Sequence, residues 1–362
     1  SRLAYRISER DQQTFSSDVK MQLQIAQGLS VSAFGAYGRN MYNDRNFRSL
    51  KDWDQRLASS FRGMAFASKH NFLHVNKTFE STIDYFTTIA DNHTITALAG
   101  YSYQYATTET FDVNNNGFTT DGFLDWNLGA GSAIQNTLLP RPGMGSFKDD
   151  NTLIAFFGRV NYSFREKYFL QAILRHEGSS KFGAHNKWGN FPAVSVGWAL
   201  SEEDFIKNVT FINELKLRAG YGVTGNQGIP NYQSIVTLGT GGVYPQSGVF
   251  HQTFGPARNP NPNLRWEQKA EFNVGLDFAV LDNMISGSVD VYNRTTKDLL
   301  NNYAAQQPPF VRNTLYTNVG SIQNHGIELQ LTAVAYRDND FGWTLTFTGN
   351  SQFNKLTKLS SD

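Results

Sequence analysis

The chain has 362 residues, of which 17% are charged and 14% aromatic, and its formal net charge is +1. This balance gives no reason to expect a nucleic-acid partner, and the charged fraction is below the ~25% of an average soluble domain. Cysteine is absent, which excludes disulfides, thiolate metal sites and cysteine nucleophiles. No apolar run is long enough for a transmembrane helix, and the start of the chain lacks a signal peptide, so we expect a mature chain or a fragment.

Apolar and polar residues alternate with a period of two in many segments along the chain. Because successive side chains of a strand point to opposite faces, these segments are expected to be strands with one apolar face. The longest is 264–280. At ~3.3 Å per residue it is about 55 Å long, well beyond the length of the ~9–11 residues that a tilted strand needs to cross a bilayer. About twelve strands are predicted, near 18–25, 29–39, 74–88, 94–106, 152–164, 168–177, 191–200, 214–224, 264–280, 284–295, 325–335 and 343–354.

The connections between these strands are short and long in strict alternation, as in outer-membrane barrels with tight inner turns and long outer loops. The sequence therefore predicts an all-β fold, a transmembrane antiparallel up-and-down β-barrel. A helical turn capped by Ser201 is expected in the short connection 201–213. Aromatic residues beside the short turns, among them Tyr168, Phe169 and Trp198, are expected to form an interfacial girdle. The long external loops are predicted near 40–73, 107–151, 178–190, 225–263 and 296–324.

Charged residues share several predicted strands with apolar ones. One Lys or Arg facing lipid at the bilayer midplane costs ~2–4 kcal/mol, so the charged faces must point inward. Both signs of charge occur, which does not fit a single-sign ion filter. The residues expected to face the lumen or a plug are Lys216, Arg218, Arg265, Glu267, Lys269 and Glu271.

One external loop contains the first half of a calcium-loop pattern, Asp112 to Gly117. The twelfth position is Phe123 rather than Glu, which excludes an EF-hand. The alternative is a polar loop tip rich in turn-forming residues. The candidate calcium ligands, and the only cofactor hypothesis, are Asp112, Asn114, Asn116 and Asp121.

The sequence offers no catalytic constellation, and we expect no enzymatic activity. Gly220–Gly225 matches G-x-G-x-x-G, but a turn at Asn226–Pro230 follows where a dinucleotide site needs a helix. Aromatic side chains in the long loops can stack on sugars, pack on peptides or contact a partner protein, and each can equally belong to a loop core. The candidates for a substrate- or partner-facing role are Trp126, Trp188, Tyr232, Tyr244 and Phe310.

Four stretches resemble one family, the SusC/RagA-like TonB-dependent outer-membrane transporters of Bacteroidota. They occur in the family's order and cover most of residues 152–331, which suggests the middle part of a barrel. Residues 1–151 fit less distinctively. The stretches are Phe157–Tyr168 with Arg175–Gly183, Asn186–Pro192 and Ser201–Phe205; Leu215–Ile229; Asn261–Glu267 with Asn273–Phe278, Ile285–Asn293 and Asp298–Leu300; and Asn318–Leu331.

The resemblance implies about twelve strands of a larger barrel of about twenty-two, in the bacterial outer membrane. It also implies import of oligosaccharides or peptides with a SusD-like surface lipoprotein, energised by the TonB-ExbB-ExbD complex through a plug that this chain does not include. Two alternatives remain open: a passive porin or outer-membrane scaffold, and a secreted soluble β-rich adhesin or glycan-binding domain. The sequence leaves the substrate undetermined.

Overall fold

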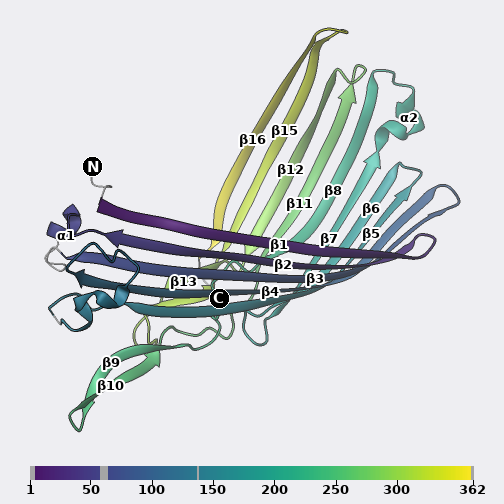
Figure 1. Cartoon of the computed structure of the whole chain (residues 1–362). Coiled ribbons are helices and arrows are strands. Elements are labelled where there is room, and N and C mark those ends of the chain that lie inside the picture. The colour runs from purple at the N-terminus through teal and green to yellow at the C-terminus, as the bar shows by residue number, and fades with distance from the viewer. Residues whose placement is uncertain (1–4, 58–63, 137, 360–362) are drawn as a thin grey trace. The chain divides into compact units, whose positions relative to one another are not determined.

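The computed structural model describes residues 5–57, 64–136 and 138–359. Within them, twelve strands form one sheet whose hydrogen-bonded order follows the chain, and every pairing between neighbours from β5 to β16 is antiparallel (Figure 1). The strands are β1 (Arg6–Ala26), β2 (Leu29–Arg48), β3 (Ala65–Ile89), β4 (His93–Phe118), β5 (Met144–Phe164), β6 (Tyr168–Ser179), β7 (Trp188–Ala199), β8 (Ile212–Asn226), β11 (Glu267–Val280), β12 (Ile285–Lys297), β15 (Ser321–Arg337) and β16 (Gly342–Lys358).

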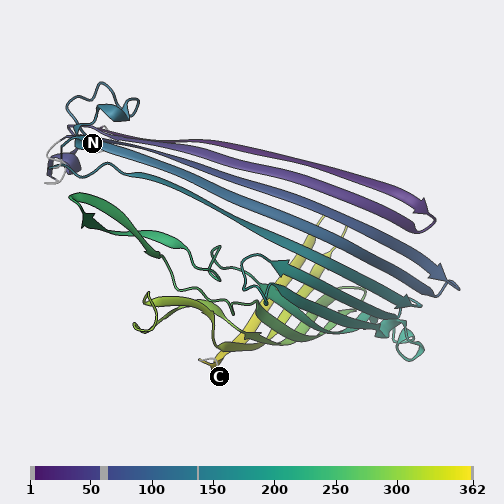
Figure 2. The same cartoon turned by 90° about the horizontal axis from the view of Figure 1, so that it is seen from below.

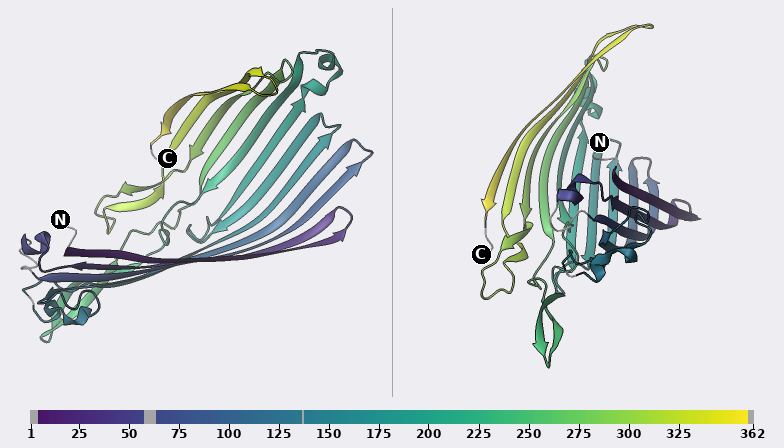
Figure 3. Two further views of the ribbon diagram at one scale, coloured as in Figure 1. Left: turned by 45° about the horizontal axis from the view of Figure 1, so that its top comes forward. Right: turned by 60° about the vertical axis from the view of Figure 1, so that its left-hand side comes forward.

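Two long connections contain hairpins of their own. One is formed by β9 (Leu238–Gln246) and β10 (Val249–Pro256), and the other by β13 (Leu300–Ala304) and β14 (Thr314–Asn318). Figure 3 shows the β9–β10 hairpin extending away from the end of the neighbouring strands β8 and β11. The helical pieces are short: α1 (Trp53–Leu57), α2 (Asp204–Lys207) and the 3₁₀ turns η2 (Leu128–Ala130), η3 (Ser132–Ile134) and η4 (Leu200–Glu202).

All twelve predicted strands are present. The connections alternate between short and long as predicted except at one point: the connection 180–187, predicted to be long, is shorter than the connection 200–211, predicted to be short. Several strands are longer than predicted, most clearly β1 to β4, which lie side by side in Figure 2. At their far ends polar side chains are frequent on both faces, so the hydrophobic alternation weakens while the strand pairing continues. Polar side chains hold these ends together: Arg10 donates to Asp44 at 2.6 and 2.8 Å, and Ser8 donates to Asn46 at 2.8 Å.

Contacts divide the chain into two compact units. Unit 1 comprises Ser1–Lys20, Phe34–Phe79 and Gln104–Thr152, and unit 2 comprises Met21–Ala33, Glu80–Tyr103 and Leu153–Asp362. Among the described residues, no helix has the length and apolarity needed to cross a membrane.

The sheet of unit 2 has an apolar face on which side chains of neighbouring strands come into register. Tyr221 of β8 pairs with both Val194 and Phe272, and Leu217 pairs with Leu276. Beyond them, Val291 of β12 pairs with Ile327 of β15. These side chains are open to the surroundings, Phe272 by 51% and Val291 by 52%. A contiguous exposed apolar face of this kind marks an interaction surface, and across a barrel wall that surface is lipid.

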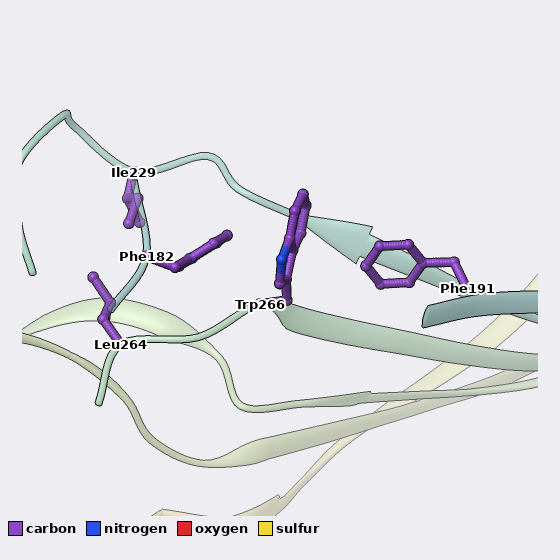
Figure 4. Close-up of a cluster of buried hydrophobic side chains, with 5 residues drawn as sticks. All are labelled: Phe182, Phe191, Ile229, Leu264 and Trp266. Atoms are coloured by element: carbon purple, nitrogen blue, oxygen red, sulfur yellow. The ribbon is translucent and has the colours of Figure 1, made fainter. Parts of the chain in front are cut away.

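The buried core of unit 2 lies beyond the outer ends of these strands, where the loops meet. Phe182 and Phe191 flank the indole of Trp266 at centroid distances of 4.9 and 5.2 Å, and Ile229 and Leu264 pack beside Phe182 (Figure 4). The sequence placed Leu264 and Trp266 on the apolar face of a strand 264–280, which is wrong. β11 begins only at Glu267, because the backbone at Arg265 is hydrogen-bonded to the Asn318 side chain instead of to a neighbouring strand.

At the short-turn end of unit 2, aromatic rings stack in a row, with 6.2 Å from Phe164 to Tyr168 and 6.2 Å from Tyr168 to Trp198. Glu203 accepts hydrogen bonds from the Tyr168 hydroxyl at 2.6 Å and the Trp198 indole at 3.0 Å. These bonds lower the pKa of Glu203. The predicted helical turn exists, but its cap is wrong: it divides into η4 and α2 around an extended Glu203, and Ser201 caps neither.

Unit 1 consists of strand segments and a long connection that folds back onto them. Its core contains Phe47, Ala65, Ala67 and Phe118. Asp121 anchors this connection by accepting bonds from the Ser49 hydroxyl at 2.6 Å and the Leu50 backbone N–H at 3.0 Å.

Candidate functional site

The polar face of unit 2 carries an ion triad at its centre. Arg218 donates to both oxygens of Asp277 at 2.6 and 2.8 Å, and to Asp290 at 3.2 Å. Its guanidinium reaches Asp290 by crossing β11 at Gly275, where a Cβ would collide with the Asp290 carboxylate and lie 2.7 Å from Arg218 Nη2. The glycine thus leaves the space through which the charges of three adjacent strands meet.

A second charged group lies further along the same face. Arg294 donates to Glu271 at 2.7 Å, and Lys269 lies 3.8 Å from the same carboxylate. The guanidinium also covers the ring of Tyr292 at 4.4 Å, and that ring in turn lies over Gly326 of β15. Opposite charges are paired along the face, so it has no single-sign field.

The structure distributes the six predicted lumen- or plug-facing residues over two levels. Arg218, Lys269 and Glu271 belong to the charged groups within the sheet, and Lys216 lies 4.7 Å from the ring of Phe169. Arg265 and Glu267 lie at the loop base instead: Arg265 pairs with Asp298 at 2.6 Å, and Glu267 accepts the Leu300 N–H at 2.9 Å. Phe169, expected in the aromatic girdle, is on the polar face because strand alternation turns it away from Tyr168.

A hollow of about 500 Å³ opens on the polar face between β4 and β11. Amide and hydroxyl residues make up half of its lining, which also includes Lys216 and Arg218. Gly220 contributes to its floor, so the first glycine of the G-x-G-x-x-G match gives open space inside β8 and not a helix start. The polar lining residues include Asn161, Gln171, Ser195 and Asn273.

Three asparagines join the two long loops of unit 2, and sequence analysis missed them. Asn259 donates to the carbonyls of Arg312 and Thr314 at 2.7 and 2.8 Å, and Asn261 donates to that of Tyr316 at 2.9 Å. Asn318 accepts the Arg265 N–H at 2.9 Å and donates to the carbonyls of Arg265 and Asp298. The sequence feature that could have indicated them is the Asn259-Pro-Asn-Pro-Asn263 repeat. Its prolines keep the backbone extended and donate no backbone hydrogen bond, so the asparagine side chains make the contacts to the other loop.

The four predicted calcium ligands are engaged with different partners. Asp112 pairs with His70 at 2.5 Å, and Asn114 accepts the Gly143 N–H at 3.0 Å. Asn116 donates to the Pro140 carbonyl, and Asp121 binds Ser49. Within 5–57, 64–136 and 138–359, no group of three or more His, Cys, Asp or Glu side chains is arranged to hold a metal ion. Each of the four side chains is thus engaged with a partner of its own, and calcium binding stays a prediction.

The five predicted loop aromatics occupy different elements. Trp188 begins β7 and stacks on His176 with 4.7 Å between centroids, so it belongs to the sheet and not to the predicted loop 178–190. Tyr232 has a left-handed backbone with φ of 62°, and Tyr244 of β9 faces His251 at 5.5 Å. Phe310 lies between β13 and β14 and is partly exposed. A substrate or partner role for each of them stays a prediction.

The fifth predicted loop aromatic, Trp126 of unit 1, lies against a group of paired charged side chains. The adjacent Asp125 carboxylate is fully buried and accepts bonds from Arg45 at 2.6, 3.0 and 3.2 Å, with Lys69 Nζ 3.7 Å away. Both cations also approach the Trp126 ring, Arg45 at 4.2 Å and Lys69 at 4.9 Å. Burial disfavours ionisation of Asp125, but the hydrogen bonds and charge of Arg45, with the charge of Lys69, hold its pKa below the usual value.

Comparison with known proteins shows to which family this architecture belongs. The family described as TonB dependent receptor-like, beta-barrel matches residues 2–358. TonB-dependent receptor P39 of Formosa agariphila is 35% identical over 292 residues, which are 81% of this chain and 26% of the relative. TonB-dependent receptor SusC of Bacteroides thetaiotaomicron is 36% identical over 214 residues, which are 58% of this chain and 21% of the relative.

A solved structure entitled "Structure of the RagAB peptide importer in the 'closed-closed' state" contains the same fold. Its TM-score is 0.88 at 24% identity, over 99% of this chain and 38% of that one. The chain thus spans about a quarter of the curated relatives it matches and over a third of this structure. It belongs to the TonB-dependent receptor β-barrel family of the SusC/RagA-like type, whose members are outer-membrane transporters and not enzymes.

Proposed function

We propose that the protein to which this chain belongs imports oligosaccharides or oligopeptides across the outer membrane, driven by TonB-ExbB-ExbD. The observation that carries the proposal is the two-faced wall of unit 2 in a chain of this family. An exposed apolar face in register suits lipid, and a face of paired charges and amides suits a wet interior or a plug. Lys216, Arg218, Lys269 and Glu271 are the interior-facing side chains in this proposal.

The paired charges of that face suit a moving partner better than an ion filter. Arg218 is held between Asp277 and Asp290, and Arg294 is held by Glu271, so the groups offer hydrogen bonds without a strong net field. Such a surface can contact a polar plug and release it at low cost, because its own charges stay compensated. Energy from TonB is proposed to reach the barrel through that plug.

A SusD-like lipoprotein is the proposed external partner, and the loops of unit 2 are its proposed contact. The β9–β10 hairpin, 238–256, contains no Lys, Arg, Asp or Glu, and Phe250 and Phe254 on it are exposed. An isolated two-stranded hairpin is marginally stable in water, so a partner surface would stabilise it. Among the predicted loop aromatics, Tyr244 and Phe310 are the ones proposed to contact this partner.

Uptake in cells producing the full-length protein tests the proposal. Labelled oligosaccharides and peptides are supplied with and without a protonophore, which removes the energy that TonB transmits. We expect saturable uptake of one class that stops when the protonophore is added, and co-purification of a SusD-like lipoprotein. Uptake that rises linearly with concentration and persists with the protonophore would establish the passive porin instead.

A further inference from the structure

We propose that a hollow in unit 1 beside Trp126 binds a neutral saccharide outside the transport path. This hollow, called the Trp126 hollow below, has a volume of about 570 Å³. The proposal goes beyond import, because most lining residues of the site share the strand face of unit 1 that carries exposed apolar side chains. Its lining residues are Glu9, Arg10, Asp11, Asn43, Asp44, Arg45, Lys69, His70, Asn71, Phe111, Val113 and Trp126.

The spacing of the lining residues identifies the face on which the hollow opens. Eight of them come in pairs two residues apart on four strands, and residues so spaced share one face. The pairs are Glu9 and Asp11 on β1, Asn43 and Arg45 on β2, Lys69 and Asn71 on β3, and Phe111 and Val113 on β4.

The same alternation continues along each strand into the apolar face of unit 1. Phe15 and Val19 of β1 follow Asp11 at even spacing and are 58% and 57% exposed. Phe15 meets Tyr37 of β2 at 6.3 Å, again on the face of Asn43. The opposite face carries polar pairs such as Ser8 with Asn46 and Arg10 with Asp44, and the second of these pairs also borders the hollow. The hollow therefore lies above the apolar face, outside the wall.

Trp126 is held as a platform before any ligand arrives. Arg45 and Lys69 lie against the ring and are both tied to the buried Asp125, yet 67% of the Trp126 surface is exposed. A ring fixed in this way loses little conformational freedom on binding, which favours affinity. Phe111, 52% exposed, adds a second aromatic surface to the same hollow.

The charges of the hollow select a neutral ligand. Arg45 is paired with Asp125 and Glu9, Lys69 with Asp125, and Arg10 with Asp44. Asn71 donates to Asn43 at 2.7 Å, which places two planar amides in the lining. An exposed indole with amides and carboxylates around it provides stacking for sugar C–H groups and hydrogen bonds for hydroxyls. A polar lining of this kind does not suit an apolar protein surface.

Binding of defined hexasaccharides to the purified full-length protein, measured by calorimetry, tests the proposal. The probes are neutral hexasaccharides of glucose, mannose and galactose, with hexagalacturonate as the charged counterpart. We expect saturable, salt-insensitive binding of at least one neutral probe, weakened at least tenfold by Trp126→Ala and less by Trp126→Phe. Trp53→Ala is the matched control, because Trp53 is another exposed tryptophan of unit 1 that is not among the lining residues, and it should leave binding unchanged.

Asn71→Ala tests the same site without changing the tryptophan, and it should also weaken binding. Uptake by Trp126→Ala cells tests whether the site lies outside the transport path. Unchanged uptake of the bound probe supports a site outside the path, and reduced uptake overturns that placement. Neither outcome depends on whether import itself needs TonB. Absence of saturable binding to every neutral probe, equal binding by Trp126→Ala, or salt-sensitive preference for hexagalacturonate would overturn the site itself.

Discussion

Single side chains hold the loops of this protein where backbone pairing stops. Asn318 is 5% exposed and makes three hydrogen bonds, to both backbone groups of Arg265 and to the Asp298 carbonyl. Sequence patterns did not reveal this role, since a lone asparagine in a loop predicts a turn as readily as a bridge. The same holds for Asp125, whose partners Arg45 and Lys69 lie far away in the chain.

Replacing Asn318 by Ala should loosen the loops without unfolding the sheet. Buried polar groups that lose their partner cost about 1–3 kcal/mol each, and three would be affected here. We expect faster hydrogen exchange and proteolysis in 259–266 and 298–318, with the strands of unit 2 unchanged. Asn302→Ala, on an exposed position of the same loop, is the control. Unaltered protection in the Asn318 variant would contradict the proposed bridge.

The Asp125 carboxylate should make the Trp126 segment sensitive to acid and insensitive to mild alkali. Its pKa is lowered in the folded protein, so its stabilisation is complete above the ordinary value of about 3.9 and is lost as pH falls through the folded pKa. Protection of 119–136 against proteolysis should stay constant from pH 8 to about pH 5 and fall below about pH 4. Asp125→Asn should remove most protection at every pH, whereas a transition near neutral pH would contradict this assignment.

At the scale of elements, period-two alternation was enough to find all twelve strands of the sheet. It failed at the outer ends of β1 to β4, where the strands continue without a clear apolar face. It also failed at Leu264 and Trp266, which are apolar because they belong to a loop core and not to a strand. Alternation also cannot reveal β9–β10, which buries little on either face, or β13–β14, whose strands have only five residues each. Residue spacing alone predicted that Lys216 lies on the polar face of the sheet and Phe272 on the apolar face. It did not predict which residues they contact.

Gly275 of β11 supplies a prediction about one strand. A Cβ there would displace Arg218 or Asp290 from the ion triad, and overpacking typically costs about 1–3 kcal/mol. Gly275→Ala should therefore lower the temperature at which the folded barrel unfolds in heat-modifiability gels. Gly35→Ala is the matched strand control, since its Cβ would meet nothing within 4 Å. Equal behaviour of the two variants would refute the role given to Gly275.

At the scale of the whole molecule, the fold and the family could be predicted from the sequence. The side-chain contacts that form the polar face and the hollows could not. Membership in an outer-membrane family excludes the secreted soluble domain considered at first. The substrate stays open because the loop aromatics occupy separate elements, each with its own neighbours. The central claim is that one face of the unit 2 wall contacts lipid and the other contacts water.

Spin labels placed singly from Phe272 to Leu276 of β11 in the membrane-embedded full-length protein test that claim most directly. The described chain contains no native cysteine, so each label position here is unique. Labels at 272, 274 and 276 should be relaxed by oxygen dissolved in lipid, and the label at 273 by a water-soluble nickel reagent. Position 275 is left unlabelled, because a side chain there would displace Arg218 or Asp290. Relaxation that shows no alternation, or the opposite phase, would contradict the account.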